Sequence, residues 1–282
     1  MKVLVTGAAG RVGRGVVAEL LDHGHEVRGL VEEAPHDPLP VDIVVGDCGD
    51  PATVDEAVDG MTAVAHLAAI PSPLGAADEH VFVNNTRATF VVLDRAARAG
   101  IGHAVITSSI SALGLAYGHP GMSPHYVPID EEHPLLAEDP YALSKQVDEC
   151  TALMMHRRYG IDVAALRLSY TGQGEQLAAR AREAREDPGQ LSHELWAWLH
   201  TADAAVAFRL ALEQRPPGYH VINVMAEDTL SDLPTRRLVD RYHPTAAIRE
   251  PLHGRVTPYD LRRARQLLGF RATRTPDGDG PD

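Results

Sequence analysis

Cysteine is scarce in this chain of 282 residues, which contains only Cys48 and Cys150. Two cysteines do not make the disulfide framework that stabilises small secreted domains, so we expect packed thiols in a reducing compartment. The chain also lacks an N-terminal apolar segment of the signal-peptide kind and any apolar run long enough to cross a bilayer. We therefore expect a cytoplasmic protein with no membrane partner.

Basic residues are few as well. The 26 Lys and Arg stand against 39 Asp and Glu, which gives a formal net charge of −13. Nucleic-acid surfaces need clustered cations, so we expect no nucleic-acid partner. An anionic cofactor must instead be held locally, by backbone N–H groups and helix N-termini. Although 15 His are present, no H-E-x-x-H or Cys-rich spacing occurs, and we assign no metal.

The chain does contain a glycine-rich turn close to its first residue. An apolar run at 3–5 predicts a buried strand, and a helical pattern follows at 12–21. Between them stand three evenly spaced glycines: Gly7, Gly10 and Gly13. This spacing allows a tight turn, brings backbone N–H groups close to an anion and lets a helix pack against the strand. A second strand is expected at 27–31, and Glu32 follows it. Its distance from Gly13 is about that at which an acidic side chain reaches the hydroxyl pair of a ribose, so the stretch predicts a dinucleotide site.

Strands and helices alternate along the chain, which predicts an α/β fold, a doubly wound parallel Rossmann sheet with its ligand beyond the carboxyl ends of the strands. Further strands are expected at 42–47, 63–67, 104–107, 162–168 and 219–224, and further helices at 51–58, 83–99, 141–159, 176–186, 202–213, 233–242 and 258–268. The long loop 114–140 is expected to be functional. We expect three parts: a dinucleotide-binding domain (1–170, joined by 201–225), a small C-terminal substrate-binding subdomain (171–200 and 226–270) and a flexible tail (271–282).

Tyr141 and Lys145 stand four residues apart and hence on one face of a helix. A tyrosine is a poor base at neutral pH, because its reference pKa is about 10. A neighbouring Lys⁺ and an oxidised nicotinamide both favour the phenolate. Ser109, at the end of an expected strand, could hold a substrate oxygen while Tyr141 exchanges its proton. These residues predict proton transfer coupled to hydride transfer.

With these residues in place, the sequence resembles the extended short-chain dehydrogenase/reductase family, which includes NAD-dependent epimerases, dehydratases and reductases. The family's T-G-x-x-G-x-x-G, G-D-x-x-D, H-L-A-A, N-x-x-x-T and Y-x-x-x-K motifs are matched by residues 6–13, 46–50, 66–69, 85–89 and 141–145. Later signals are matched at 198–203 and 260–270. The resemblance covers most of the chain.

The resemblance implies a catalytic set and a cofactor set. The catalytic residues are Ser109, Tyr141 and Lys145. The cofactor contacts are Gly7, Gly10, Arg11, Val12, Gly13, Glu32, Asp47, Cys48, Leu67, Ala68, Ala69, Asn85, Tyr141 and Lys145. It also implies a homodimer formed through helices 86–99 and 141–159 as a four-helix bundle.

The departures from the family pattern bear on the substrate. Members that dehydrate sugar nucleotides carry Asp-Glu after the catalytic hydroxyl, whereas Ile110 and Ser111 stand here. The Asn that follows the sixth strand in sugar-nucleotide enzymes is also missing. Three arginines could still meet a diphosphate, but a solvated helix face is the favoured interpretation: Arg180, Arg182 and Arg185. A compact pocket for a smaller or more apolar carbonyl compound would use Ser111, Tyr170, Trp196 and His200, although core packing explains Trp196 about as well.

Glu32 and Glu33 stand where relatives that prefer NADP often carry Arg, and two carboxylates would repel a 2′-phosphate, so we expect NAD. NADP stays possible because of Arg11, Arg14 and Arg28. The sequence predicts an NAD(P)-dependent oxidoreductase that moves a hydride to or from a carbonyl or secondary alcohol of a small molecule. An epimerase of sugars or sugar nucleotides with the same three catalytic residues is the alternative, and a non-catalytic dinucleotide sensor is a lesser one.

Overall fold

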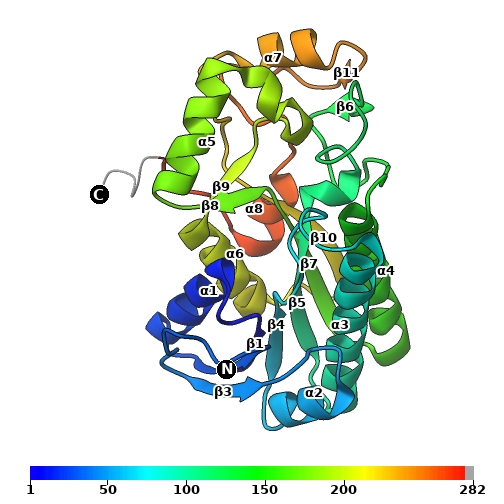
Figure 1. Ribbon diagram of the computed structural model, residues 1–282, viewed down its shortest axis with the longest axis vertical. Coiled ribbons are helices and arrows are strands. Elements are labelled where there is room, and N and C mark those ends of the chain that lie inside the picture. The colour runs from blue at the N-terminus through cyan, green and yellow to red at the C-terminus, as the bar shows by residue number, and fades with distance from the viewer. Residues whose placement is uncertain (277–282) are drawn as a thin grey trace.

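The computed structural model describes residues 1–276 and has a seven-stranded parallel sheet at its centre (Figure 1). The strand order is β10-β7-β5-β4-β1-β2-β3. The strands are β1 (Lys2–Thr6), β2 (Glu26–Val31), β3 (Asp42–Val45), β4 (Ala63–His66), β5 (His103–Ser109), β7 (Asp162–Leu168) and β10 (Tyr219–Val224). All neighbouring pairs run parallel, so the predicted Rossmann sheet is confirmed.

Helices cover both faces of the sheet. The helices α1 (Arg11–Asp22), α6 (Thr201–Gln214) and α8 (Arg262–Leu268) pack on one face, and α2 (Pro51–Val58), α3 (Asp78–Arg98) and α4 (Pro140–Tyr159) pack on the other (Figure 1). Successive residues of β1 pack into hydrophobic clusters on opposite faces of the sheet. Val3 and Val5 are buried with α1 and α6, whereas Leu4 is buried with α2, α3 and α4. The strand is therefore apolar throughout, as expected for a parallel sheet covered on both sides.

The chain reverses its winding direction at β1, which lies between β2 and β4. Thr6 is opposite His66 in the register of β1 with β4, and Ser109 is opposite Leu168 in the register of β5 with β7. Thr6, His66 and Ser109 therefore lie at one carboxyl edge of the sheet. In open α/β sheets this is the edge at which ligands bind.

The elements above that edge in Figure 1, which we call the subdomain, enclose a second hydrophobic cluster. The subdomain comprises α5 (Glu175–Glu186), the 3₁₀ helix η2 (Pro188–Glu194), α7 (Thr235–Tyr242) and two short parallel sheets. These sheets pair β8 (Tyr170–Gly172) with β9 (Trp198–His200), and β6 (Tyr126–Val127) with β11 (Ala247–Ile248). The cluster also includes apolar residues from 110–129, a segment that the sequence analysis placed in the dinucleotide-binding domain.

Some predicted ends need correction. Helix α3 begins at Asp78 rather than at residue 83, and α8 begins at Arg262 rather than at 258. The expected tail starts too early, because the backbone N–H groups of Thr273 and Arg274 both donate to Asp203, at 3.2 and 3.1 Å. Residues 277–282 lie outside the described residues.

Over residues 1–276, no helix is both long and apolar enough to cross a membrane. The same residues contain no group of three His, Cys, Asp or Glu side chains arranged to hold a metal ion.

Candidate active site

The glycine turn after β1 is fixed by close backbone contacts. Gly7 has a φ of +64°, and a Cβ there would lie 2.8 Å from the backbone N of Ala68. A Cβ on Gly13 would lie 2.1 Å from the carbonyl oxygen of Gly7. Neither position accepts a side chain. Gly10, the N-cap of α1, supplies no side-chain cap, so the first turn of α1 presents its N–H groups as an anion site.

A cavity of about 220 Å³ opens at the carboxyl ends of β1, β2 and β4. Its lining contains six of the predicted cofactor residues: Gly7, Glu32, Asp47, Cys48, Ala68 and Ala69. Ile70, His80, Asn84 and Ala88 also line it and were not predicted. Glu32 follows directly after β2 and is exposed, so its carboxylate is free to accept hydrogen bonds from a ligand.

Asp47 and Cys48 shape the wall of this first cavity after β3. The Asp47 Oδ1 atom accepts a hydrogen bond of 2.6 Å from the backbone N of Gly49, which closes a tight turn. Burial, reinforced by the Asp47 carboxylate, raises the pKa of the Cys48 thiol to about 12. Cys48 is therefore an unreactive thiol at neutral pH.

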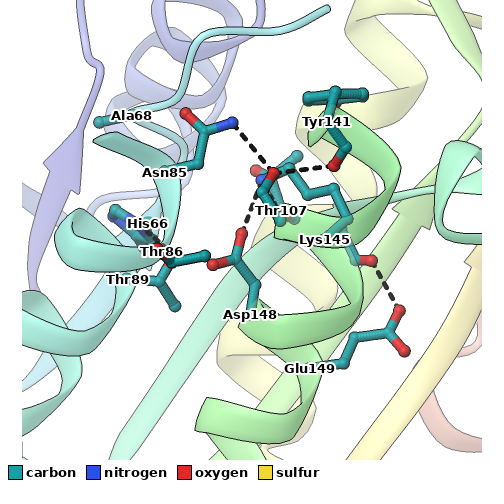
Figure 2. A network of polar contacts seen from close by, with 12 residues as sticks. His66, Ala68, Asn85, Thr86, Thr89, Thr107, Tyr141, Lys145, Asp148 and Glu149 are labelled. Atoms are coloured by element: carbon teal, nitrogen blue, oxygen red, sulfur yellow. Dashed lines mark hydrogen bonds and ion pairs between the residues drawn. The ribbon is translucent and has the colours of Figure 1, made fainter. Parts of the chain in front are cut away.

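Asn85 lies behind the cavity wall rather than in its lining. Its Oδ1 accepts from the backbone N of Ile70 at 2.8 Å, and its Nδ2 donates to the Ile70 carbonyl at 3.0 Å and to Ser144 Oγ at 3.2 Å. These bonds tie the loop after β4 to α3 and α4, and Figure 2 shows Asn85 between that loop and α4. The Asn85 side chain thus positions this loop, and the adjacent Asn84 faces the cavity, so the cofactor contact of Asn85 stays a prediction.

His66 links β1 to α3 through an uncharged imidazole ring. Thr6 Oγ1 accepts from the backbone N–H groups of Leu67 and Ala68, so its own proton is donated to His66 Nδ1 at 2.7 Å. The opposite nitrogen, Nε2, then donates to Thr89 Oγ1 at 3.2 Å. Burial, reinforced by the charge of Lys145, lowers the pKa of His66 to about 3, so the ring stays neutral. This chain of bonds holds the H-L-A-A segment against the glycine turn.

A second cavity, of about 330 Å³, adjoins the first, because the consecutive residues Ile70 and Pro71 line one each. Two predicted catalytic residues, Ser109 and Tyr141, line the second cavity. It is lined by Arg11, Val12, Pro71, Ser72, Thr107, Ser108, Ser109, Ile110, Ser111, Ala116, Tyr117, Tyr141, Leu168, Ser169, Tyr170, Thr171 and Glu194.

Tyr141 occupies the first turn of α4, and local sequence explains why the helix begins there. Asp139 caps the helix by accepting from the backbone N of Ala142 at 2.8 Å, and Pro140 takes the first helical position, where no N–H is needed. The Tyr141 side chain is held edge-on by Tyr117, at 6.4 Å between ring centroids. The start of α4 therefore fixes the phenol at the cavity wall.

Ser109 is the last residue of β5 and caps the 3₁₀ helix η1 (Ile110–Leu113). Its Oγ accepts from the backbone N of Ser111 at 3.0 Å. Because that bond uses an acceptor site, the hydroxyl proton stays available for donation to a substrate oxygen. Ser109 thus keeps a hydroxyl donor available in the cavity that it lines together with Tyr141.

Lys145, one of only two lysines in the chain, lies one turn after Tyr141 and is almost fully buried. Its Nζ donates to the Thr107 carbonyl at 3.1 Å and to Asp148 Oδ2 at 3.0 Å (Figure 2). The ammonium lies 5.9 Å from the centroid of the Tyr141 ring. Burial alone would lower the pKa of Lys145, but Asp148 and then Tyr141 raise it above its ordinary value. Asp148 was not predicted from the sequence, although its place one turn beyond Lys145 was visible.

A buried ion pair supports this helix from behind. Both Glu149 oxygens accept from Arg167, each at 2.7 Å, and Glu149 Oε1 also accepts from Ser108 Oγ at 2.6 Å. The pair joins α4 to β7 and β5. It therefore anchors the helix that carries Tyr141 and Lys145 to the central sheet.

Two of the four predicted pocket residues line the second cavity, namely Ser111 and Tyr170, and two do not. Trp196 is fully buried in the core of the subdomain, where its Nε1 donates to the Pro188 carbonyl at 2.6 Å. His200 caps α6, with its Nδ1 accepting from the backbone N of Ala202 at 3.1 Å. Both expectations need correction, because packing and capping explain these side chains.

The lining also includes residues that the sequence did not reveal. Tyr117 comes from the loop expected to be functional, and Ser169 and Thr171 flank Tyr170 on the way into β8. Glu194, at the end of η2, is an acid in the wall. No motif distinguishes these residues, because the fold of the subdomain brings them to the cavity.

Comparison with known proteins gives a consistent family result. The model of the "NAD dependent epimerase/dehydratase family" matches residues 3–224. A dTDP-glucose 4,6-dehydratase of Streptomyces antibioticus is 29% identical over 97% of this chain and 88% of its own. A 2-alkyl-3-oxoalkanoate reductase of Stenotrophomonas maltophilia is 33% identical over 77% of this chain and 67% of its own.

Solved structures give the same result. A short-chain dehydrogenase/reductase superfamily protein from Agrobacterium tumefaciens, solved with bound NAD, is 26% identical and has a TM-score of 0.71. The match covers 98% of this chain and 94% of that one. Some other relatives match in part only: a Mycobacterium tuberculosis protein is 36% identical over 39% of this chain, which is 12% of its own length.

Proposed function

Because the chain belongs to the NAD-dependent epimerase/dehydratase family, we propose that it is an oxidoreductase that moves a hydride between NAD and a carbonyl or secondary alcohol of a small molecule. One observation carries this proposal. Ser109 and Tyr141 share a cavity that adjoins the cavity at the glycine turn, and Lys145 lies beside Tyr141. A hydride site and a proton donor would thus be neighbours.

The residues at the glycine turn fit a dinucleotide. Gly7 and Gly13 leave no room for a Cβ, and the first turn of α1 offers N–H groups to a diphosphate. Glu32 would accept from the adenine-side ribose hydroxyls, and Asp47 with Cys48 would border the adenine.

The surroundings of Glu32 favour NAD over NADP. Arg28, which could have paired with a 2′-phosphate, donates to the Asp59 carbonyl at 2.7 Å, at the end of α2. Arg14 donates to the carbonyls of Ala9 and Asp37. With both arginines committed to backbone oxygens, the Glu32 carboxylate dominates the cavity at this point and would repel the phosphate.

When bound, the nicotinamide would accept a hydride from the carbinol carbon in the oxidative direction and return it in the reductive one. In the oxidative direction, Tyr141 takes the hydroxyl proton of the substrate, and in the reductive direction it returns that proton to the carbonyl oxygen. Ser109 holds the same oxygen by donating its hydroxyl proton. Lys145, kept protonated by Asp148, stabilises the Tyr141 phenolate and would donate to the nicotinamide ribose.

Dehydration is not proposed, because Ile110 and Ser111 follow Ser109 where dehydrating members of the resembled family carry Asp-Glu. Epimerisation with the same three residues is the second candidate.

The test is to supply NADH and a panel of carbonyl compounds to the purified chain. Net NADH consumption supports the oxidoreductase, whereas interconversion of a substrate without net consumption supports the epimerase. A chain that binds NADH but converts nothing would support the sensor alternative.

We also propose that a second copy of the chain covers α3 and α4. These helices pack against each other and leave Val83, Phe90 and Leu143 exposed, at 54%, 43% and 44%. Three apolar side chains on adjoining helices fit a four-helix bundle between two copies. Light scattering on the native chain should give a dimer mass and Phe90→Glu a monomer mass, and a monomeric native chain would contradict this proposal.

A further inference from the structure

Glu194 gives the second cavity a charge that the proposed reaction does not require. Both of its carboxylate oxygens accept from Arg180 Nη2, at 2.6 and 2.7 Å. Arg180 also donates to Glu183 at 3.1 Å, and its guanidinium lies 4.7 Å from the centroid of the Tyr170 ring. Glu194 and Tyr170 line the cavity, so Arg180 lies behind them with its charge already matched.

The other arginines of α5 are also paired. Arg182 pairs with Glu175, and Arg185 pairs with Asp232 at 3.4 Å. Arg11 also lines the cavity, but it belongs to the first turn of α1, where the cofactor diphosphate would bind. On this side of the cavity a substrate therefore meets the Glu194 carboxylate. The three arginines of α5 are all paired with acids.

Hydroxyl groups make up much of the remaining polar wall. Ser169 is 94% buried, and within residues 1–276 neither its Oγ nor Thr107 Oγ1 has a hydrogen-bond partner. Burial, reinforced by Tyr141 and Glu194, raises the pKa of Tyr117 to about 12, so this phenol stays a donor at neutral pH. A buried polar atom without a partner is costly, so Ser169 Oγ and Thr107 Oγ1 each gain from pairing with a hydroxyl or carbonyl group of the ligand.

Resting on the hydride transfer proposed above, we propose that the substrate is an uncharged, polyhydroxylated carbonyl compound or its alcohol, such as a free sugar, and that the Glu194–Arg180 pair excludes anionic relatives. The wall hydroxyls donate to and accept from the substrate hydroxyls. Glu194 accepts from one more of them and repels a carboxylate or phosphate placed there. The pair thus determines specificity without taking part in the chemistry.

The test uses matched substrates with the full chain and NAD⁺: galactose, galacturonate and UDP-galactose, with arabinose and xylose as further neutral sugars. We expect NADH formation from at least one neutral sugar, with a kcat/KM at least about tenfold above that of every anionic compound. Preference for an anionic compound would overturn the assignment. Failure of every neutral sugar to form NADH, in a sample that binds NADH, would also overturn the assignment. That result would not contradict the proposed cofactor site.

Glu194→Gln sharpens this test, because it removes the negative charge from the cavity wall and one of the two carboxylates that pair with Arg180. We expect the neutral-to-anionic ratio of kcat/KM to fall about tenfold, with NADH affinity unchanged. Glu183→Gln is the matched control: it takes a carboxylate from the same arginine, but Glu183 does not line the cavity. An unchanged ratio in Glu194→Gln, or an equal fall in both variants, would contradict the role of Glu194.

Discussion

Lys145 Nζ lies 3.0 Å from Asp148 Oδ2, and both side chains are almost fully buried, at 3% and 1% exposure. An ammonium removed from water loses its hydration, so its charge persists only if another group compensates it. Asp148, one turn further along α4, supplies that compensation. The residue that keeps Lys145 protonated is therefore part of the same helix as the Tyr141–Lys145 pair.

Asp148→Asn should make the function of Lys145 sensitive to alkaline pH. Without the carboxylate, burial dominates and the pKa of Lys145 falls, whereas in the native chain it is raised. The native lysine should keep its charge until the pH passes above its ordinary pKa of about 10.4. We expect NADH binding to weaken at a lower pH in the variant than in the native chain, as measured by fluorescence titration across the pH range.

Asp94→Asn is the control for this experiment. Asp94 is also largely buried, and it pairs with Arg98 at 2.8 Å on α3, away from Lys145. Its substitution should leave the pH profile of NADH binding unchanged. Superimposable profiles for the Asp148 variant and the native chain would show that Lys145 does not depend on Asp148.

Glu32→Arg should change the cofactor preference. The native carboxylate lines the first cavity, and an arginine there would attract the 2′-phosphate that Glu32 repels. We expect the ratio of NADPH to NADH affinity to rise at least about tenfold, or about 1.4 kcal/mol. Glu26→Arg makes the same charge change at the opposite end of β2 and should leave the ratio of NADPH to NADH affinity unchanged. Native protein that binds NADPH tenfold more tightly than NADH would contradict the assignment of NAD.

Arg167→Met should destabilise the fold severely. The substitution leaves the Glu149 carboxylate buried without its cation, which costs about 3–5 kcal/mol in the free energy of unfolding. Replacing Glu149 by Leu as well removes the orphaned charge and should restore at least half of that loss. Chemical denaturation measures both effects. Arg236→Met breaks an exposed pair with Asp240 and should change the free energy by less than about 1 kcal/mol.

The sequence was most informative where local backbone requirements decide the structure. Gly7 and Gly13 were predictable because no other residue fits those positions, and β1 and α1 follow from hydrophobic pattern. For Trp196 the sequence left pocket and core packing open, because its burial depends on packing within the subdomain. Glu194 and Ser169 reach the cavity only through tertiary contacts between distant segments. The cofactor half of the site was therefore easier to predict than the substrate half.

The proton transfer assigned to Tyr141 is the central claim, and Tyr141→Phe tests it most directly. The phenylalanine keeps the ring beside Tyr117 and Lys145 but removes the hydroxyl. On a substrate turned over by the native chain, we expect the NADH Kd to change less than about threefold while kcat falls about 10²–10⁴-fold, the scale of losing a positioned acid/base. Turnover equal to that of the native chain would contradict the assignment of Tyr141 as the proton donor.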